Sequence, residues 1–187
     1  MFGTELLTVE AFFQRRHELP EEGRWCELVR GEVVELSPPD ALHCGVVLNV
    51  AKALGRYVQQ TGKGCPCFDI GLVVARNPDT LRRANVAYFL RGPRFELYDR
   101  GFSEVPPELV IDVASSPDRR QTVSARVQEY LASGVRLAWI LDPQSQVAHA
   151  HRKGAKHTLA ADAALTSEDL LPGFRCEIGP LFDVPKW

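Results

Sequence analysis

The chain has 187 residues, of which 45% are hydrophobic and 25% charged, an ordinary globular composition. Its 22 basic and 24 acidic residues give a formal net charge of -2, which excludes a global positive field holding the chain on nucleic acid or an anionic membrane. Binding of that kind would need a local patch. No internal repeat or low-complexity tract divides the sequence, so we expect one domain over residues 1–187.

The composition also bears on location and redox state. No apolar run approaches the roughly 18 residues that a membrane span needs. The opening Met1 to Glu5 lacks the charged and apolar regions of a secretory signal. These features predict a soluble, cytoplasmic protein without membrane contact. Five cysteines, with Cys65 and Cys67 as the close pair, favour reduced thiols, while a metal-binding or redox role for that pair stays open.

Caps, turns and apolar periodicity divide the first half of the chain into short elements. Thr8 and Asp40 are typical helix N-caps, and Gly62 is typical of a helix C-terminus. Arg30 and Gly31 separate two β-rich runs by the two residues of a tight hairpin. In chain order we expect a helix over 8–16, strands over 25–29 and 32–36, a helix over 41–61, strands over 68–75 and 85–90 around a turn, and a loop over 91–107.

The second half contains a strand, helix, strand unit. Residues 108–114 and 137–141 are nearly continuous apolar runs, typical of strands buried on both faces, and a helix over about 122–132 connects them. A right-handed crossover of this kind makes the two strands parallel. Residues 146–151 and 157–161 then flank a basic turn as a hairpin. Together the elements predict an α/β fold with a mixed central β-sheet, flanking helices on both faces and an added N-terminal β-hairpin.

Asp112 is the one charge inside the apolar run of the strand over 108–114. An ionised carboxylate there is costly unless it is paired, hydrogen-bonded or bound to a metal. It also lies near the C-terminal end of its strand, where open α/β sheets place ligand groups. A capping role toward Ser115 or Ser116 is the alternative. Arg126 and Tyr130 are four residues apart on the expected helix, so both can point toward this part of the sheet.

Several motifs, in this order along the chain, resemble the Uma2 family of restriction endonucleases. They are Trp25 to Glu32, Ser37-Pro38-Pro39 with His43, Glu108 to Pro117, Tyr130 to Val135 followed by Ala138 to Pro143, Leu170 to Phe174, and Leu181-Phe182. The resemblance covers nearly the whole chain. It implies a restriction-endonuclease-like core of the PD-(D/E)XK type, in which a helix, three strands, a helix and a strand surround a metal site.

The resemblance also implies the residues of that site. Family members hold Mg²⁺ or Mn²⁺ with two carboxylates, and a lysine supplies positive charge at the scissile phosphate. Here the first metal-ligand position falls on Asn85, after Ala84, so the family's Pro-Asp is absent. The second falls on Asp112 and the lysine position on Arg126. An Asn offers a metal only a neutral oxygen, and an Arg does not exchange protons near neutral pH.

Two functions are compatible with such a departed site. The first is a metal-dependent DNA endonuclease in which His43 or Glu27, which match further family positions, assist. The second is a catalytically inactive nuclease-fold module that binds nucleic acid or a protein partner. His43 alternatively has a structural role on its helix. Pro78-Asp79 has the residue types of the missing Pro-Asp. It lies in the expected turn, however, and not at the start of the second core strand.

Two groups of basic residues lie outside the implied site. His149 and His151 share one face of a strand, and the hairpin could bring His157 opposite them as a metal site requires; an exposed basic hairpin is the alternative. DNA is the partner that the resemblance implies, and homo-oligomerisation stays open. A nucleic-acid patch needs clustered cations. The residues expected to form one are Arg82, Arg83, Arg91, Arg94, Arg152, Lys153 and Lys156.

Overall fold

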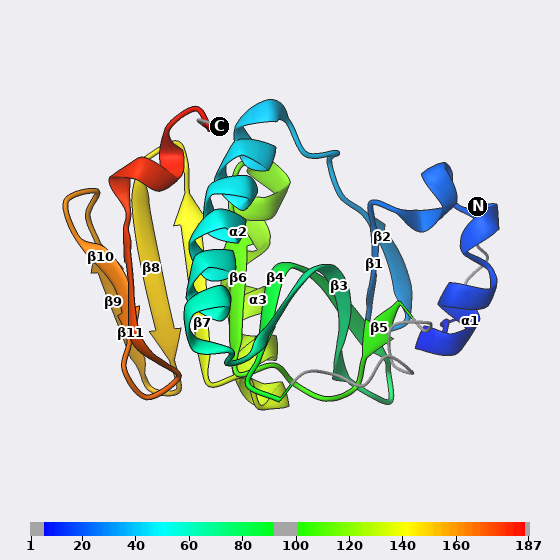
Figure 1. Cartoon of the computed structure of the whole chain (residues 1–187). Helices are drawn as coiled ribbons and strands as arrows, with labels where there is room; N and C mark the ends of the chain where they lie inside the picture. Colours follow the sequence, from blue (N-terminus) through cyan, green and yellow to red (C-terminus); the bar gives the residue numbers. More distant parts are fainter. Residues whose placement is uncertain (1–5, 92–100, 186–187) are drawn as a thin grey trace.

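The computed structural model describes residues 6–91 and 101–185, which contain a nine-stranded mixed sheet and a separate two-stranded sheet (Figure 1). The main sheet runs in the order β2-β1-β4-β6-β7-β8-β9, and β3 pairs with β4 and β5. Its strands are β1 (Cys26–Val29), β2 (Glu32–Glu35), β3 (Cys65–Ala75), β4 (Thr80–Phe89), β5 (Phe102–Ser103), β6 (Leu109–Val113), β7 (Leu137–Asp142), β8 (Val147–Arg152) and β9 (Ala155–Leu159). The second sheet contains β10 (Ala164–Ser167) and β11 (Leu171–Glu177).

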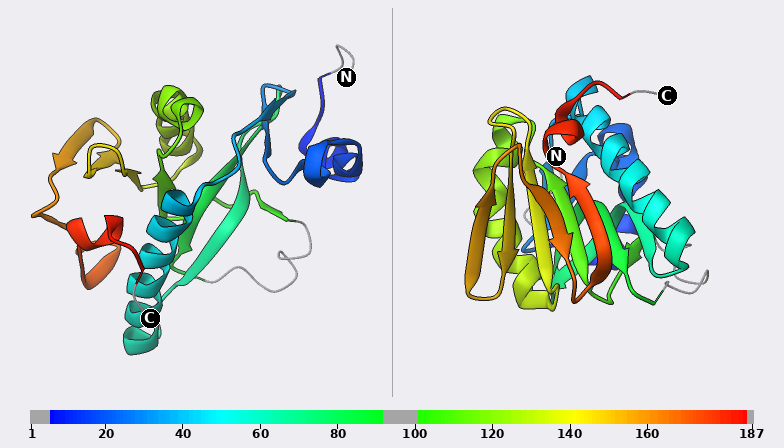
Figure 2. Two further views of the ribbon diagram at one scale, coloured as in Figure 1. Left: turned by 90° about the horizontal axis from the view of Figure 1, so that it is seen from above. Right: turned by 60° about the vertical axis from the view of Figure 1, so that its left-hand side comes forward.

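Helices cover both faces of the main sheet, as predicted. The long helices α2 (Ala41–Thr61) and α3 (Pro117–Ser133) lie on opposite faces (Figure 2, left). The short α1 (Val9–Gln14) and the 3-10 turns η1 (Arg16–Glu18) and η2 (Pro20–Gly23) lie beside β1 and β2, and η4 (Gly179–Phe182) lies against α2. None of the described helices is both long and apolar enough to cross a membrane.

The face under α2 holds the largest apolar cluster. The Asp40 side chain accepts a hydrogen bond from the His43 backbone amide at 2.7 Å, and Gly62 ends the helix in the left-handed conformation with φ 64°. Between these caps, Val50 and Leu54 belong to a buried stripe that packs in one cluster with Trp139. The two-stranded sheet of β10 and β11 contributes to the same cluster, so it covers the part of this face that α2 leaves open.

The position of β4 creates the frame for the site. Strand β3 pairs along nearly all of β4, so β1 and β6 share the other edge. Strand β1 meets that edge at Leu81, and β6 meets it from Val86 onward. Residues 82–85 therefore have no strand partner on that edge, and the backbone groups among them that face it, those of Arg83 and Asn85, need hydrogen bonds from elsewhere.

The sequence predicted the principal elements but misplaced several of their ends. Strands β3 and β4 both begin earlier than predicted, and α3 begins at Pro117 rather than near residue 122, because Pro at the first helical position and an extended Ser116 before it start the helix. The β8–β9 hairpin turns over two residues instead of five. The expected loop contains β5, with residues 92–100 outside the described part, and the β10–β11 pair was not predicted.

Gly64 provides a test of the packing at the start of β3. It has φ +74°, and an added Cβ would lie 2.0 Å from the Tyr88 hydroxyl oxygen, which donates to the Lys63 carbonyl at 2.8 Å. Gly154 has a similar φ of +78° with open space around it. We expect Gly154→Ala to cost about 1 kcal/mol from backbone strain alone, and Gly64→Ala to cost roughly 1–3 kcal/mol more from overpacking. Urea unfolding of both variants checks this; equal losses would contradict the described contact.

Candidate functional site

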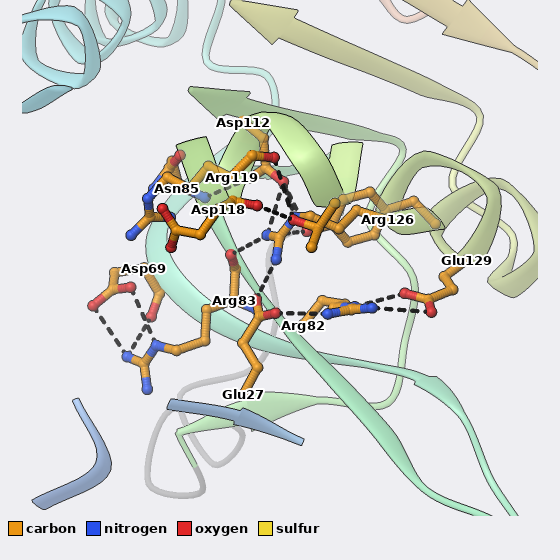
Figure 3. A network of polar contacts seen from close by, with 12 residues as sticks. Glu27, Asp69, Arg82, Arg83, Asn85, Asp112, Asp118, Arg119, Arg126 and Glu129 are labelled. Atoms are coloured by element: carbon orange, nitrogen blue, oxygen red, sulfur yellow. Dashed lines mark hydrogen bonds and ion pairs between the residues drawn. The ribbon is translucent and has the colours of Figure 1, made fainter. Parts of the chain in front are cut away.

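A buried network of charged side chains joins β1, β4, β6 and α3 (Figure 3). Its centre is Glu27 on β1, which is 0% exposed. One carboxylate oxygen of Glu27, Oε2, accepts from Arg82 Nη1 at 2.9 Å, and the other, Oε1, accepts from Arg126 Nη1 at 2.5 Å. Arg82 also forms a two-pronged pair with Glu129 at 2.6 and 3.1 Å. Each guanidinium is thus shared by carboxylates from two elements.

Asp112 forms the second half of the network. Its Oδ2 accepts from Arg126 Nε and Nη2 at 3.1 and 2.9 Å and from the Tyr130 hydroxyl at 3.0 Å. Its Oδ1 accepts from the backbone amide of Asn85 at 3.0 Å. The predicted convergence of Asp112 with Arg126 and Tyr130 is therefore present. Residues Asn85 and Asp112 lie next to each other on neighbouring strands, as the site mapping requires.

The network supplies the hydrogen bonds that β4 lacks between β1 and β6. The backbone amide of Arg83 donates to Glu27 Oε1 at 2.7 Å, and the Arg83 carbonyl accepts from Arg126 Nη2 at 2.9 Å. Two residues further on, the Asn85 amide donates to Asp112 as described above. These side chains act where a neighbouring strand would otherwise pair. The polar atoms of Glu27, Arg126 and Asp112 thus satisfy the backbone of β4.

A hydrogen-bonded chain connects this edge to α2. Asn85 Oδ1 accepts from the backbone amide of Val113 at 2.8 Å, which turns its Nδ2 toward His43 Nε2 at 3.1 Å. Since an amide nitrogen only donates, Nε2 is the acceptor, and His43 Nδ1 donates to Ser115 Oγ at 2.8 Å. Both ring nitrogens of His43 therefore have partners within the protein.

The pKa shifts of His43, Arg126 and Tyr130 agree with these hydrogen-bond roles. Burial, followed by the positive charge of Arg119, lowers the pKa of His43 to about 4, so the ring is neutral at neutral pH. Burial alone would lower the pKa of Arg126, but the surrounding Tyr130, Asp112 and Glu27 groups outweigh it and hold that pKa well above its ordinary value. Burial also raises the pKa of Tyr130 well above its ordinary value, so its hydroxyl remains a donor.

The residues present do not fit a divalent cation. The Arg126 guanidinium contacts the Asp112 oxygen that a metal would need, and Asn85 uses its carbonyl oxygen on Val113. The cavity that Asn85 and Asp112 line has a volume of about 10 Å³, room for about one water at most. Within residues 6–91 and 101–185, no group of three or more His, Cys, Asp or Glu side chains is arranged to hold a metal.

Most of the arginines expected at a nucleic-acid patch are already paired. Arg82 is 4% exposed and belongs to the network, so its assignment to a DNA-binding surface is wrong. Arg83 pairs with Asp69 at 3.0 Å, and Arg152 pairs with Asp169 at 2.7 Å. Because Arg83 and Arg152 belong to strands far apart in the sheet order, they do not form one patch.

The remaining basic candidates divide into separate places. Arg91 is exposed at the end of β4, and Arg94 lies outside the described residues. Lys153 and Lys156 are exposed on the β8–β9 hairpin. Because Arg82 is buried, the predicted seven-residue patch is not complete among the described residues.

The three histidines do not converge on one metal site. His149 and His151 lie on one face of β8, as the spacing of two predicts. His157 is paired with Ala150, so its side chain lies on the opposite face of the sheet. The two-residue turn sets this register and separates the third imidazole from the other two.

Sequence reasoning missed Glu129, whereas the turn acid Asp79 lies away from the site, as its place in the expected turn predicted. Glu129 follows Arg126 by three residues on α3, and this spacing was a usable signal for a second acid at the same flank. Asp79 does not reach the site; its Oδ2 accepts from the Val9 amide at 2.9 Å and from Arg76, joining α1 to the β3–β4 turn.

Removing the shared guanidinium tests the structural role of the network. We expect Arg126→Met to lower the free energy of unfolding by about 3–5 kcal/mol, because Asp112 then stays buried without its cation and Glu27 keeps only Arg82. Arg152→Met is the matched control: its pair with Asp169 is 38% and 47% exposed, so the expected loss is about 1 kcal/mol or less. If urea unfolding gave the same loss of unfolding free energy for both variants, the buried ion pairs would contribute no more to stability than the exposed pair.

The His43 assignment predicts a pH dependence of stability. Its pKa is about 4 in the folded state against 6.5 for the ordinary side chain, so the unfolded chain binds more protons between these values and stability falls as the pH falls. From about pH 6 to pH 4.5, the wild type should lose up to roughly 1.4 kcal/mol per pH unit more than His43→Gln. The exposed His157→Gln is the control. Parallel pH profiles for wild type and His43→Gln would refute the assignment.

Comparison with known proteins gives the context for this geometry. A putative nuclease belonging to DUF820 from Anabaena variabilis ATCC 29413 has a crystal structure that superposes with a TM-score of 0.77 at 18% identity, covering 94% of this chain and 97% of that chain. This likeness shows the shared fold. No curated protein matches the sequence. The family model Uma2, described as "Putative restriction endonuclease", matches residues 10–179. The chain therefore belongs to the Uma2 family.

Proposed function

We propose that this Uma2 protein is a nuclease-fold binding module that does not hydrolyse phosphodiester bonds. The observation that carries the proposal is the use of Asp112 and Glu27 as hydrogen-bond acceptors for the β4 backbone, with Arg126 held between them. A hydrolytic site of the implied kind needs carboxylate oxygens that are open to a cation. Here those oxygens complete the sheet instead.

The chemistry of the remaining positions supports the same conclusion. His43 uses one nitrogen on Asn85 and the other on Ser115, so it has no open position for a proton relay. Arg126 keeps its proton near neutral pH and does not replace a lysine in proton transfer. The competing proposal, a metal-dependent DNA endonuclease with Asp112 and Asn85 as ligands, rests on family membership.

A nicking assay separates the two proposals. Purified wild type and Asp112→Ala are incubated with supercoiled plasmid in Mg²⁺ and, separately, in Mn²⁺. We expect no nicking by the wild type above the level of Asp112→Ala, because no metal is held at Asp112. Nicking by the wild type that Asp112→Ala abolishes would establish the endonuclease and reject the module.

The reverse substitutions test the site mapping independently. Asn85→Asp/Arg126→Lys restores the second acid and frees Asp112 Oδ2 from the guanidinium, so Mn²⁺ affinity in calorimetry should rise by at least about tenfold, or about 1.4 kcal/mol. Two adjacent acids raise each other's proton affinity, so the gain should be larger at pH 8 than at pH 6. The exposed Asn77→Asp is the control for added charge. An unchanged affinity in a folded double variant would show that Asn85 is not a ligand position.

A further inference from the structure

A second concave surface lies beside α3. This groove, called here the hairpin groove, has a volume of about 610 Å³ and lies between α3 and the end of the β8–β9 hairpin. Its lining includes Arg120, Val123, Val127, Leu131, His151 and Lys156. The charged network uses Arg126, Glu129 and Tyr130 of the same helix, and Val123 lines both the groove and the small cavity at Asp112. The hairpin groove and the network are therefore neighbouring features that meet at Val123.

An aliphatic strip forms one wall of the groove. Val123, Val127 and Leu131 recur every four residues, so they lie along one side of α3 over about 12 Å. Val127 packs on the sheet in one cluster with Ile140, while Val123 and Leu131 are only partly buried against that cluster. The strip is long enough to contact about four residues of an extended chain.

Donors and positive charges complete the groove. Lys156 lies directly across from His151 in the β8–β9 register and forms no ion pair with any described residue. Arg120 uses Nη1 on the carbonyls of Ala114 and Ser115, at 3.3 and 3.0 Å. His151 Nε2 is buried and has no partner within the described residues. Among the residues that the structure describes, no carboxylate lines the groove.

From this combination we infer that the hairpin groove binds an extended, acidic segment of a protein partner in which aliphatic and carboxylate side chains alternate. The aliphatic side chains pack on Val123, Val127 and Leu131, and the carboxylates pair with Lys156 and Arg120. The inference rests on the binding role proposed above and gives the partner its chemistry. Single-stranded nucleic acid fits less well, because the groove has an aliphatic wall in place of aromatic stacking faces and few cations for successive phosphates.

The test uses a fluorescein-labelled synthetic peptide of about eight residues in which Glu alternates with Leu or Val. Anisotropy titrations at low and high salt measure its affinity for the full chain. We expect salt-sensitive binding, weakened about tenfold by Lys156→Glu and by Leu131→Asp. Lys153→Glu, on the same hairpin but outside the lining, is the matched control and should change the affinity less than about twofold. Thermal unfolding confirms that each variant is folded.

Two further experiments test which kind of ligand binds and whether it binds at the hairpin groove. A peptide with Lys in place of Glu should not bind, and labelled oligothymidine should bind more weakly than the acidic peptide. Amide shifts in two-dimensional NMR spectra should cluster at residues 120–131 and 151–156. Tighter binding of oligothymidine that Lys156→Glu weakens would make the groove a nucleic-acid site, and absent or Lys156-independent peptide binding would overturn the inference. The peptide titrations do not measure plasmid nicking. A negative result in them would therefore reject the groove inference without bearing on the proposal that the fold does not hydrolyse DNA, which the nicking assay tests.

Discussion

The structure depends on how the partner-free edge of β4 is satisfied between Leu81 and Val86. Strands β1 and β6 each pair with one end of that edge and leave its middle without a neighbouring strand. Buried backbone groups in such a gap need partners. Glu27 and Asp112 accept the amides, and Arg126 donates to the carbonyl, so three side chains from three elements replace a strand.

This arrangement explains why several charges are buried together. Two carboxylates that each accept a backbone amide require compensating cations, and Arg126 and Arg82 provide them at the same depth. A buried ion pair of this kind contributes little net stability compared with apolar packing, but losing one partner is costly. Its effect is to fix the relative positions of β1, β4, β6 and α3. In this chain, Glu27, Asp112 and Arg126 hydrogen-bond to the backbone of β4.

Helix α3 contributes to both the charged network and the hairpin groove. It contributes Arg126, Glu129 and Tyr130 to the network, and an aliphatic strip and Arg120 to the hairpin groove. A network of paired charges beside an open, positively charged groove is compatible with a fold that serves in binding. The network also holds α3, which forms one wall of the groove, to the sheet through Arg126 and Tyr130.

Reasoning from the residues predicted the α/β class, both long helices, the N-terminal hairpin and the approach of Asp112 to Arg126 and Tyr130. These features follow from local caps, apolar periodicity and the cost of a lone buried carboxylate, all of which are readable over a few residues. The family resemblance pointed to Glu27, but only the folded chain shows that Arg82 joins the same cluster, because its contact with Glu27 depends on β1 pairing with β4 across more than fifty residues of chain. The fold also placed His157 on the opposite face, since one residue of register reverses the side of every strand side chain. Whether an arginine is exposed, and whether a carboxylate is free to bind a cation, depend on how the chain packs. Only the folded structure therefore shows that Asp112 pairs with Arg126 and that Arg82 is buried.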